Sequence, residues 1–272
     1  LVGFKAANGL MKQGLAVNML ITSAYPLAKQ VDAVAGKMIR DTLVDHGLTV
    51  EVGVSVTAFE GHGRVAAAHT DDGRELPCDL VIVGKGVSPA CGFLSRDRID
   101  VDLGVLVDDH LQTSVAGVYA AGDAAEARDI VRDCPWVNAI WPEAAVQGRI
   151  AGLNMAGRPV RYKGSLSRNV MRVFDLDVMT IGLGNTEGIE GARVIRAGGP
   201  SNSWFRSLVL RDDILVGATL INQIEQGGLL RALIEQRRPL RVPPEALLSP
   251  SFNIALLLSI PKASRLSRVS RL

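Results

Sequence analysis

The sequence predicts an α/β protein that continues into an α+β domain, and three observations carry this prediction. A helical pattern at the very start of the chain leads into the short apolar run 16–21. Two more apolar runs, 79–86 and 117–121, are nearly continuous, which is typical of strands buried on both faces of a parallel sheet. After residue 169, strand patterns follow one another before one last helix, an order that is typical of the α+β class.

The composition is that of an ordinary globular protein. The chain has 272 residues, of which 47% are hydrophobic and 21% charged, and its net charge is +2. The low net charge and the 4% of aromatic residues give no support for nucleic-acid binding. No apolar run approaches the roughly 20 residues of a membrane-spanning helix. Cys78, Cys91 and Cys134 are too far apart for a CxxC site, which favours a reducing, cytoplasmic setting.

The first part of the chain predicts two helices, each ended by a glycine and followed by a strand. The first helix runs from the amino end to Gly14 and precedes the strand 16–21. The second covers residues 31–46 and precedes a strand over residues 48–59. An Asp-Gly dipeptide at 72–73 then predicts a hairpin. This order is that of a βαβ unit that has lost its first strand.

The stretch from Thr113 to Glu126, TSVAGVYAAGDAAE, predicts a ligand site at the end of a strand. Its apolar part, 117–121, consists of small and β-branched residues and stops at Gly122 and Asp123. Glycine permits an unusual backbone angle or the close approach of a ligand. Asp123 would place a carboxylate at the carboxyl end of the strand, where open α/β sheets bind their ligands. A buried strand that ends in an Asx turn is the simpler alternative.

This stretch resembles a motif of a known family. The run T-S-x-x-G-V-Y-A-A-G-D, which ends at Asp123, is similar to the second flavin-contacting motif of the FAD-dependent pyridine nucleotide-disulfide oxidoreductases. The resemblance implies that Gly122 and Asp123 bind FAD, with the aspartate holding the ribityl chain or the pyrophosphate. It extends over nearly the whole chain, up to about Gln236.

The resemblance also implies a Rossmann-like NAD(P)-binding domain at residues 1–88, with its first strand missing. Gly3 falls at the third glycine of the family's G-x-G-x-x-G turn, so the chain is expected to be the later part of a longer protein. Ile21 occupies the position of the acidic ribose-binding residue, so the pattern does not distinguish NADH from NADPH. Thr22, which follows it, is expected to offer at most a hydroxyl group to the ribose. Gly86 is expected to lie near the bound dinucleotide.

Residues 89–158 are expected to form the later part of an FAD-binding domain. Their long helix begins around Pro142 and ends at Gly157. In the family the amino end of this helix points at the flavin ring, which implies that Glu143 and Ala144 contact the cofactor. The helix dipole there would stabilise the negative charge of reduced flavin. For Glu143, a purely structural role at the start of a core helix is the alternative.

Residues 159–242 are expected to form the family's α+β C-terminal domain, through which a homodimer would form. The segment 208–232 is most similar to ferredoxin-reductase-like, NADH-oxidase-like and nitrite-reductase-like members. The His-Pro and Glu pair of the disulfide-reductase branch is not present in this part of the sequence. Residues 243–272 are expected to be a separate tail, whose basic, serine-containing end we interpret as solvated.

The function implied by the resemblance is the transfer of a hydride from NAD(P)H to FAD and of electrons to an unidentified acceptor. In such enzymes the cofactors carry the chemistry, and the protein supplies binding and electrostatics. The alternative is a non-catalytic interaction module on the same fold. The missing acidic ribose-binding residue and the missing leading glycines favour that alternative.

Overall fold

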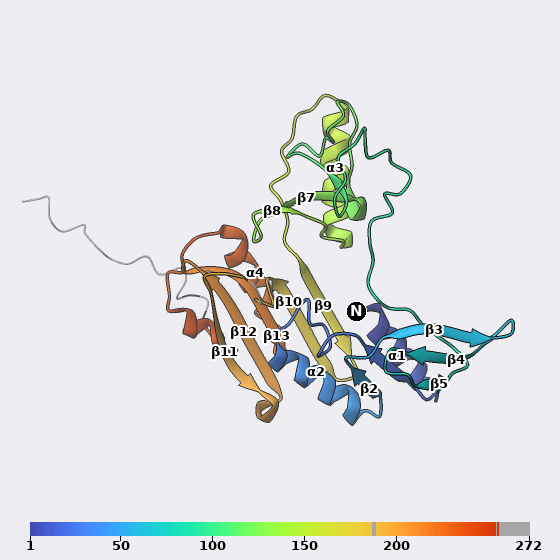
Figure 1. Cartoon of the computed structure of the whole chain (residues 1–272). Coiled ribbons are helices and arrows are strands. Elements are labelled where there is room, and N and C mark those ends of the chain that lie inside the picture. Colours follow the sequence, from blue (N-terminus) through green and yellow to red (C-terminus); the bar gives the residue numbers. More distant parts are fainter. Residues whose placement is uncertain (187–188, 254, 256–272) are drawn as a thin grey trace, which may run out of the picture.

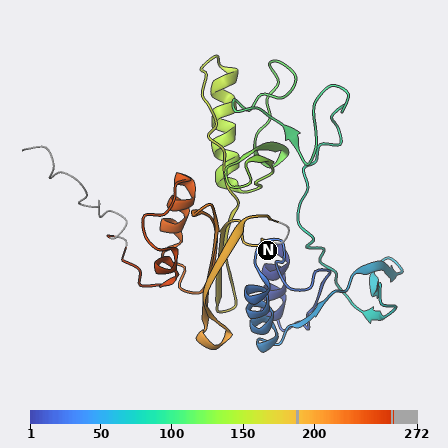
Figure 2. The same ribbon diagram turned by 60° about the vertical axis from the view of Figure 1, so that its left-hand side comes forward.

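The computed structural model describes residues 1–186, 189–253 and 255, which form three units (Figure 1). An N-terminal unit of helices and short strands packs beside a five-stranded sheet, which belongs to the C-terminal unit. A middle unit built around one long helix stands apart from the N-terminal unit, and an extended connection joins the two (Figures 1 and 2). The predicted combination of an α/β part with an α+β part is confirmed.

The N-terminal unit has the predicted order of two helices, each followed by a strand. Strands β1 and β2 are parallel, with Asn18 opposite Thr49. Asp32 caps the second helix by accepting the Ala35 N–H at 3.0 Å. Gly47, at φ +87°, ends that helix as expected. The elements are α1 (Val2–Lys12), β1 (Asn18–Ile21), α2 (Ala33–Asp45) and β2 (Thr49–Val52).

A three-stranded antiparallel sheet follows, made of β3 (Val56–Gly61), β4 (Val65–Thr70) and β5 (Glu75–Pro77). The predicted hairpin turn at residues 72–73 joins β4 to β5. The prediction of one continuous strand over 48–59 is wrong, because Gly53 has a φ of +75° and directs the chain out of β2.

The middle unit combines a small sheet with one long helix. A 3₁₀ turn, η1, leads directly into the central strand of that sheet. The helix begins at Trp141, so Pro142 lies in its first turn as predicted, and its N-cap Ile140 is extended. The elements are β6 (Val105–Leu106), η1 (Gly122–Ala124), β7 (Ala125–Asp129), β8 (Cys134–Trp136) and α3 (Trp141–Met155).

Two predicted buried strands are absent from the described residues. The segment 79–86 has no regular structure, and Val83 in it is 70% exposed. In the segment 117–121, Tyr119 forms only an isolated antiparallel bridge with Gln112. A strand requires a neighbouring strand for its N–H and C=O groups, and neither segment has one among the described residues.

The C-terminal unit is an antiparallel sheet with the strand order β11-β12-β13-β10-β9. This sheet and its one long helix confirm the predicted α+β arrangement. The elements are β9 (Arg168–Val173), β10 (Leu176–Gly182), β11 (Ala192–Gly199), β12 (Trp204–Arg211), β13 (Ile214–Ile221), α4 (Gly227–Gln236) and the 3₁₀ helices η2 (Pro200–Asn202) and η3 (Pro244–Leu248).

Both faces of the five-stranded sheet are covered. On one face, Leu208 and Leu220 pack with α4 and η3. On the other, Phe205 and Met171 pack with residues of α1 and α2. Removal of this apolar surface from water is what holds the N-terminal and C-terminal units together.

The start of the predicted tail belongs to the core. Leu247, Leu248 and Phe252 are buried in the same cluster as α4, so the expectation of a separate tail from residue 243 is wrong for these residues. The basic end of the predicted tail lies outside the described residues. Among the described residues, no helix combines the length and apolar character needed to cross a bilayer.

Candidate functional site

The turn that precedes Asp123 is fitted against the start of α3. Gly122 has a φ of +74°, and a Cβ added there would lie 3.3 Å from the Cβ of Ala144. Its backbone N–H donates to Oε1 of Gln147 at 2.8 Å. The glycine is therefore required both by its backbone angle and by the closeness of the helix. The structure thus brings together Gly122 and Ala144, both of which were expected to contact FAD.

Asp123 lies in η1, and its side chain is exposed. Within the described residues, its carboxylate has no ion pair or hydrogen-bond partner. The side chain therefore does not accept the local backbone N–H bond that defines an Asx turn. A free carboxylate at this position is available to a ligand that offers hydroxyl groups.

Glu143 points into the protein instead. Its side chain is buried, and its Oε1 accepts a hydrogen bond from Nη1 of Arg168 at 2.8 Å. Its Oε2 accepts one from the hydroxyl of Tyr162 at 3.2 Å. Both carboxylate oxygens thus have internal partners, and a direct contact of this side chain with a cofactor stays a prediction.

Two backbone N–H groups at the amino end of α3 already have backbone hydrogen-bond partners. The N–H groups of Glu143 and Ala144 both donate to the Ile140 carbonyl, at 3.0 and 3.1 Å. These two N–H groups are therefore not free to bind a ligand. The positive end of the helix dipole remains, close to the exposed Asp123.

The N-terminal residues assigned to the nicotinamide dinucleotide occupy two places. Gly3, in the first turn of α1, lies against Gly84, where an added Cβ would come within 3.0 Å of the Gly3 Cα. Gly86 is exposed with φ +94°. Thr22 follows β1, and its Oγ1 lies 3.1 Å from Oγ of Ser55. The glycine contact shows the close packing expected of the third fingerprint glycine, although residues 79–86 are not a strand.

The predicted residues therefore fall into two groups rather than one. Gly122, Asp123, Glu143 and Ala144 lie at the junction of η1 and α3 in the middle unit. Gly3, Thr22 and Gly86 belong to the N-terminal unit and its connection. Sequence reasoning missed Gln147, Tyr162 and Arg168, which connect the first group internally. The spacing of Glu143 and Gln147 puts both side chains on one face of the helix, and this spacing could have predicted that Gln147 lies beside the site.

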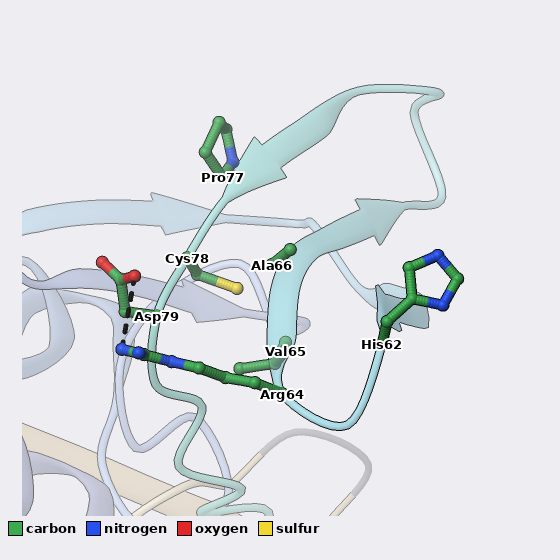
Figure 3. A pocket seen from close by; sticks show the side chains of 7 residues that line it. All are labelled: His62, Arg64, Val65, Ala66, Pro77, Cys78 and Asp79. Atoms are coloured by element: carbon green, nitrogen blue, oxygen red, sulfur yellow. Dashed lines mark ion pairs between the residues drawn. The ribbon is translucent and has the colours of Figure 1, made fainter.

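A hollow on the small antiparallel sheet contains none of these residues. Figure 3 shows it between β4 and β5, with Arg64 and Asp79 paired at its edge, 3.6 Å apart. Its volume is about 450 Å³, and it is open to solvent. The residues that line it are His62, Arg64, Val65, Ala66, Pro77, Cys78 and Asp79. We assign it no role.

Asp108, Asp109 and His110 are close enough together to share a cation. However, the Asp109 carboxylate already accepts hydrogen bonds from Arg161 and lies 3.0 Å from Nδ1 of His110. The Arg161 guanidinium holds the pKa of Asp109 below its usual range. A fixed positive charge at this carboxylate opposes the binding of a metal ion, so the cluster is an ion pair rather than a metal site.

A family model described as "Pyridine nucleotide-disulphide oxidoreductase" matches residues 1–150 of the chain. One similar curated protein is the "NADH-dependent phenylglyoxylate dehydrogenase subunit epsilon" of Aromatoleum evansii, which is 31% identical over 243 residues. That alignment covers 88% of this chain and 57% of the relative. Another is the "Nitrite reductase [NAD(P)H]" of Bacillus subtilis, 27% identical over 87% of this chain and 28% of the relative.

Solved structures share the fold. The covalent putidaredoxin reductase–putidaredoxin complex matches with a TM-score of 0.83 and 25% identity, over 96% of this chain and 62% of that one. The water-forming NADH oxidase of Lactobacillus brevis bound to NADH matches with a TM-score of 0.81 and 21% identity, over 94% and 62%. The chain thus spans less than two thirds of the length of these proteins.

Members of the matched family are oxidoreductases that use FAD together with NADH or NADPH. The family model covers more than half of the chain, and it includes both groups of predicted cofactor residues. The resemblance inferred from residues 113–123 is therefore confirmed. This chain belongs to the pyridine nucleotide-disulphide oxidoreductase family.

Proposed function

We propose that the protein oxidises NAD(P)H, transfers the hydride to FAD and passes the electrons to a separate acceptor. The observation that carries this proposal is the exposed, unpaired carboxylate of Asp123 beside the positive end of α3. FAD, when bound, would supply the hydride acceptor. The task of the chain is then to bind and orient it.

The residues at the η1–α3 junction fit a flavin nucleotide. Asp123 can accept hydrogen bonds from the hydroxyl groups of a ribityl chain, because no donor among the described residues occupies its oxygens. The dipole of α3 stabilises negative charge near its amino end. The carboxylate of Glu143 forms an ion pair with Arg168, so its negative charge does not offset the positive end of the helix dipole.

For the nicotinamide dinucleotide we propose the N-terminal group of residues. Gly86 is exposed and lies in the connection between the N-terminal and middle units, and apart from its chain neighbours no described residue comes within 4 Å of a Cβ added there. Thr22 offers a hydroxyl at the end of β1, the edge at which parallel sheets bind nucleotides. Gly3 sets the start of α1 against Gly84 and so supports this edge rather than contacting the ligand.

We propose a protein as the electron acceptor. One solved neighbour was captured with its redox partner, putidaredoxin, and one relative is named an "Assimilatory nitrate reductase electron transfer subunit". A cytoplasmic setting and a homodimer formed through the C-terminal unit complete the proposal. The alternative of a non-catalytic module rests on the missing acidic ribose-binding residue and the missing leading glycines alone. The named relatives are oxidoreductases and give it no support.

The direct test is to change Asp123→Asn in the full-length protein and measure the flavin content after purification. Asparagine keeps the size of the side chain but replaces one acceptor oxygen by a donor and removes the charge. Loss of one charged hydrogen bond to a ribityl hydroxyl is expected to weaken flavin binding by about 10-fold or more.

Asp212→Asn serves as the control, because Asp212 lies in the β12–β13 turn of the C-terminal unit and has a φ of +50° that asparagine tolerates. This variant is expected to keep the flavin content of the unaltered protein. Equal flavin content in the Asp123 and Asp212 variants would contradict the proposed site.

A further inference from the structure

A continuous path of buried hydrogen bonds runs from the η1 turn to the first strand of the C-terminal sheet. The Gly122 N–H donates to Oε1 of Gln147 at 2.8 Å, and Nε2 of Gln147 donates to the hydroxyl of Tyr162 at 3.1 Å. Tyr162 donates to Glu143 at 3.2 Å, and Arg168 donates to the other oxygen of Glu143 at 2.8 Å. Gln147 is 3% exposed, Tyr162 4% and Glu143 7%.

The direction of every hydrogen bond in this path is fixed from its two ends. A backbone N–H can only donate, so Oε1 rather than Nε2 of Gln147 must face Gly122. The amide nitrogen then faces the Tyr162 oxygen, which leaves the hydroxyl hydrogen for Glu143. Arg168 can only donate as well, so Glu143 accepts from both sides. The path therefore has a single consistent arrangement of donors and acceptors.

The protonation of Tyr162 supports this arrangement. Burial raises the pKa of Tyr162 above its ordinary value, so the phenol keeps the hydrogen that it donates to Glu143. The Ser165 hydroxyl also lies against the Tyr162 oxygen. The backbone N–H of Tyr162 donates to the Asp109 carbonyl at 2.6 Å, which ties this residue to the loop that follows β6.

The path ends at the residue that precedes Asp123. Rotation of the Gly122 peptide would change the direction of the next side chain, and glycine itself offers little resistance to rotation. The hydrogen bond to Gln147 is what holds this glycine against α3, at a place where Ala144 leaves little room for a Cβ on residue 122. A side chain on the helix thus sets the direction in which an exposed carboxylate points.

We propose that Gln147 is a positioning residue for the flavin site: it fixes the Gly122 peptide, and so the direction of the Asp123 carboxylate, while Tyr162, Glu143 and Arg168 hold its amide in the required orientation. This inference rests on the proposed function, because it assumes that Asp123 binds the flavin. It also links the C-terminal sheet, through Arg168 in β9, to the geometry of that site.

The first test concerns the path itself and needs no cofactor. Hydrogen exchange of the Gly122 amide is measured by NMR in the 272-residue chain and in the variants Gln147→Met and Tyr162→Phe. Methionine has a similar volume but no acceptor oxygen, so exchange at Gly122 is expected to rise about fivefold or more. Phenylalanine removes the hydroxyl that holds the Gln147 side-chain amide in place, so that this amide can rotate. A smaller rise in the exchange of the Gly122 N–H is therefore expected in this variant.

Gln112→Met is the matched control. It removes the same kind of side-chain amide from the middle unit, but the Gln112 amide donates to the Tyr119 hydroxyl at 3.0 Å, outside the path. Exchange at Gly122 is expected to be unchanged in this variant. Unchanged exchange in the Gln147 variant, or an equal rise in all three variants, would overturn the path.

The second test measures flavin affinity in the full-length protein by titration with FAD. Gln147→Met is expected to weaken binding about fivefold or more, Tyr162→Phe to weaken it less, and Gln112→Met to leave it unchanged. Faster exchange at Gly122 with unaltered flavin affinity would overturn the positioning role. If the unaltered protein binds no FAD, the proposed function fails, whereas the exchange experiment still decides whether the path exists.

Discussion

Arg206 shows how a single buried side chain holds the last described part of the chain in place. It lies on β12, is 1% exposed, and donates to the Leu247 and Ser249 carbonyls at 2.9 and 3.1 Å. It also donates to Oε1 of Gln226 at 2.7 Å. Burial lowers the pKa of Arg206, but a guanidinium remains charged at any physiological pH. Its charge is thus shared among carbonyl-type oxygens from α4 and η3.

We predict that Arg206→Met lowers the free energy of unfolding by about 2–4 kcal/mol, because several buried oxygens lose their donors at once. Urea unfolding followed by circular dichroism measures the change. Arg172→Met is the control, since Arg172 lies exposed on β9, 3.7 Å from Asp177. An exposed pair of this kind contributes about 1 kcal/mol or less. Equal effects of the two substitutions would contradict the role given to Arg206.

At the residue scale, the sequence predicted the participants of the site better than their contacts. Gly122 and Ala144 were both assigned to the flavin, and they lie together. The internal partners of Glu143 could not be predicted, because Tyr162 and Arg168 are 19 and 25 residues away in sequence. Contacts over such distances are set by how the units pack, which a motif does not record.

Strand β13 depends on a glycine where two segments meet backbone to backbone. A Cβ added at Gly217 would lie 1.8 Å from the Leu183 carbonyl oxygen, an atom that no side-chain rotation can move. Gly217→Ala is therefore expected to lower the free energy of unfolding by about 1–3 kcal/mol or more. Thermal or urea unfolding of the variant chain measures this.

The same substitution in α3 is expected to have the opposite effect. Gly152 lies in the helix interior, is exposed, and has no atom within 4 Å of an added Cβ among the described residues. Alanine there raises helix propensity, so Gly152→Ala is expected to raise the free energy of unfolding of the 272-residue chain by about 0.5–1 kcal/mol. Destabilisation by Gly152→Ala, or stabilisation by Gly217→Ala, would show that these packing arguments are wrong.

At the element scale, helices and hairpins were predicted well and isolated strands poorly. The helices carry their own periodicity and end signals, and α1, α2 and α3 lie within a few residues of their predicted bounds. The run 79–86 has the composition of a buried strand, yet the described residues provide no strand beside it. Composition predicts which segments could pair, whereas pairing itself depends on a partner that local sequence does not specify.

At the scale of the whole molecule, the other two units both pack against the sheet of the C-terminal unit. Its two faces bury α4 and η3 on one side and α1 and α2 on the other. Ile130 and Val131, from the turn after β7, join the first of these clusters. The middle unit, with Asp123, is thereby attached to the same core. We therefore expect cofactor binding in the middle unit to stabilise the whole chain against unfolding.

The central claim is that the middle unit positions a flavin that accepts a hydride from NAD(P)H. The most direct measurement is the visible absorbance of the full-length protein, purified and then mixed with NADH or NADPH in the absence of oxygen. The account predicts a yellow protein whose flavin band is bleached by at least one of the two nucleotides. A colourless protein that cannot be loaded with FAD, or a flavin band that neither nucleotide bleaches, would contradict it.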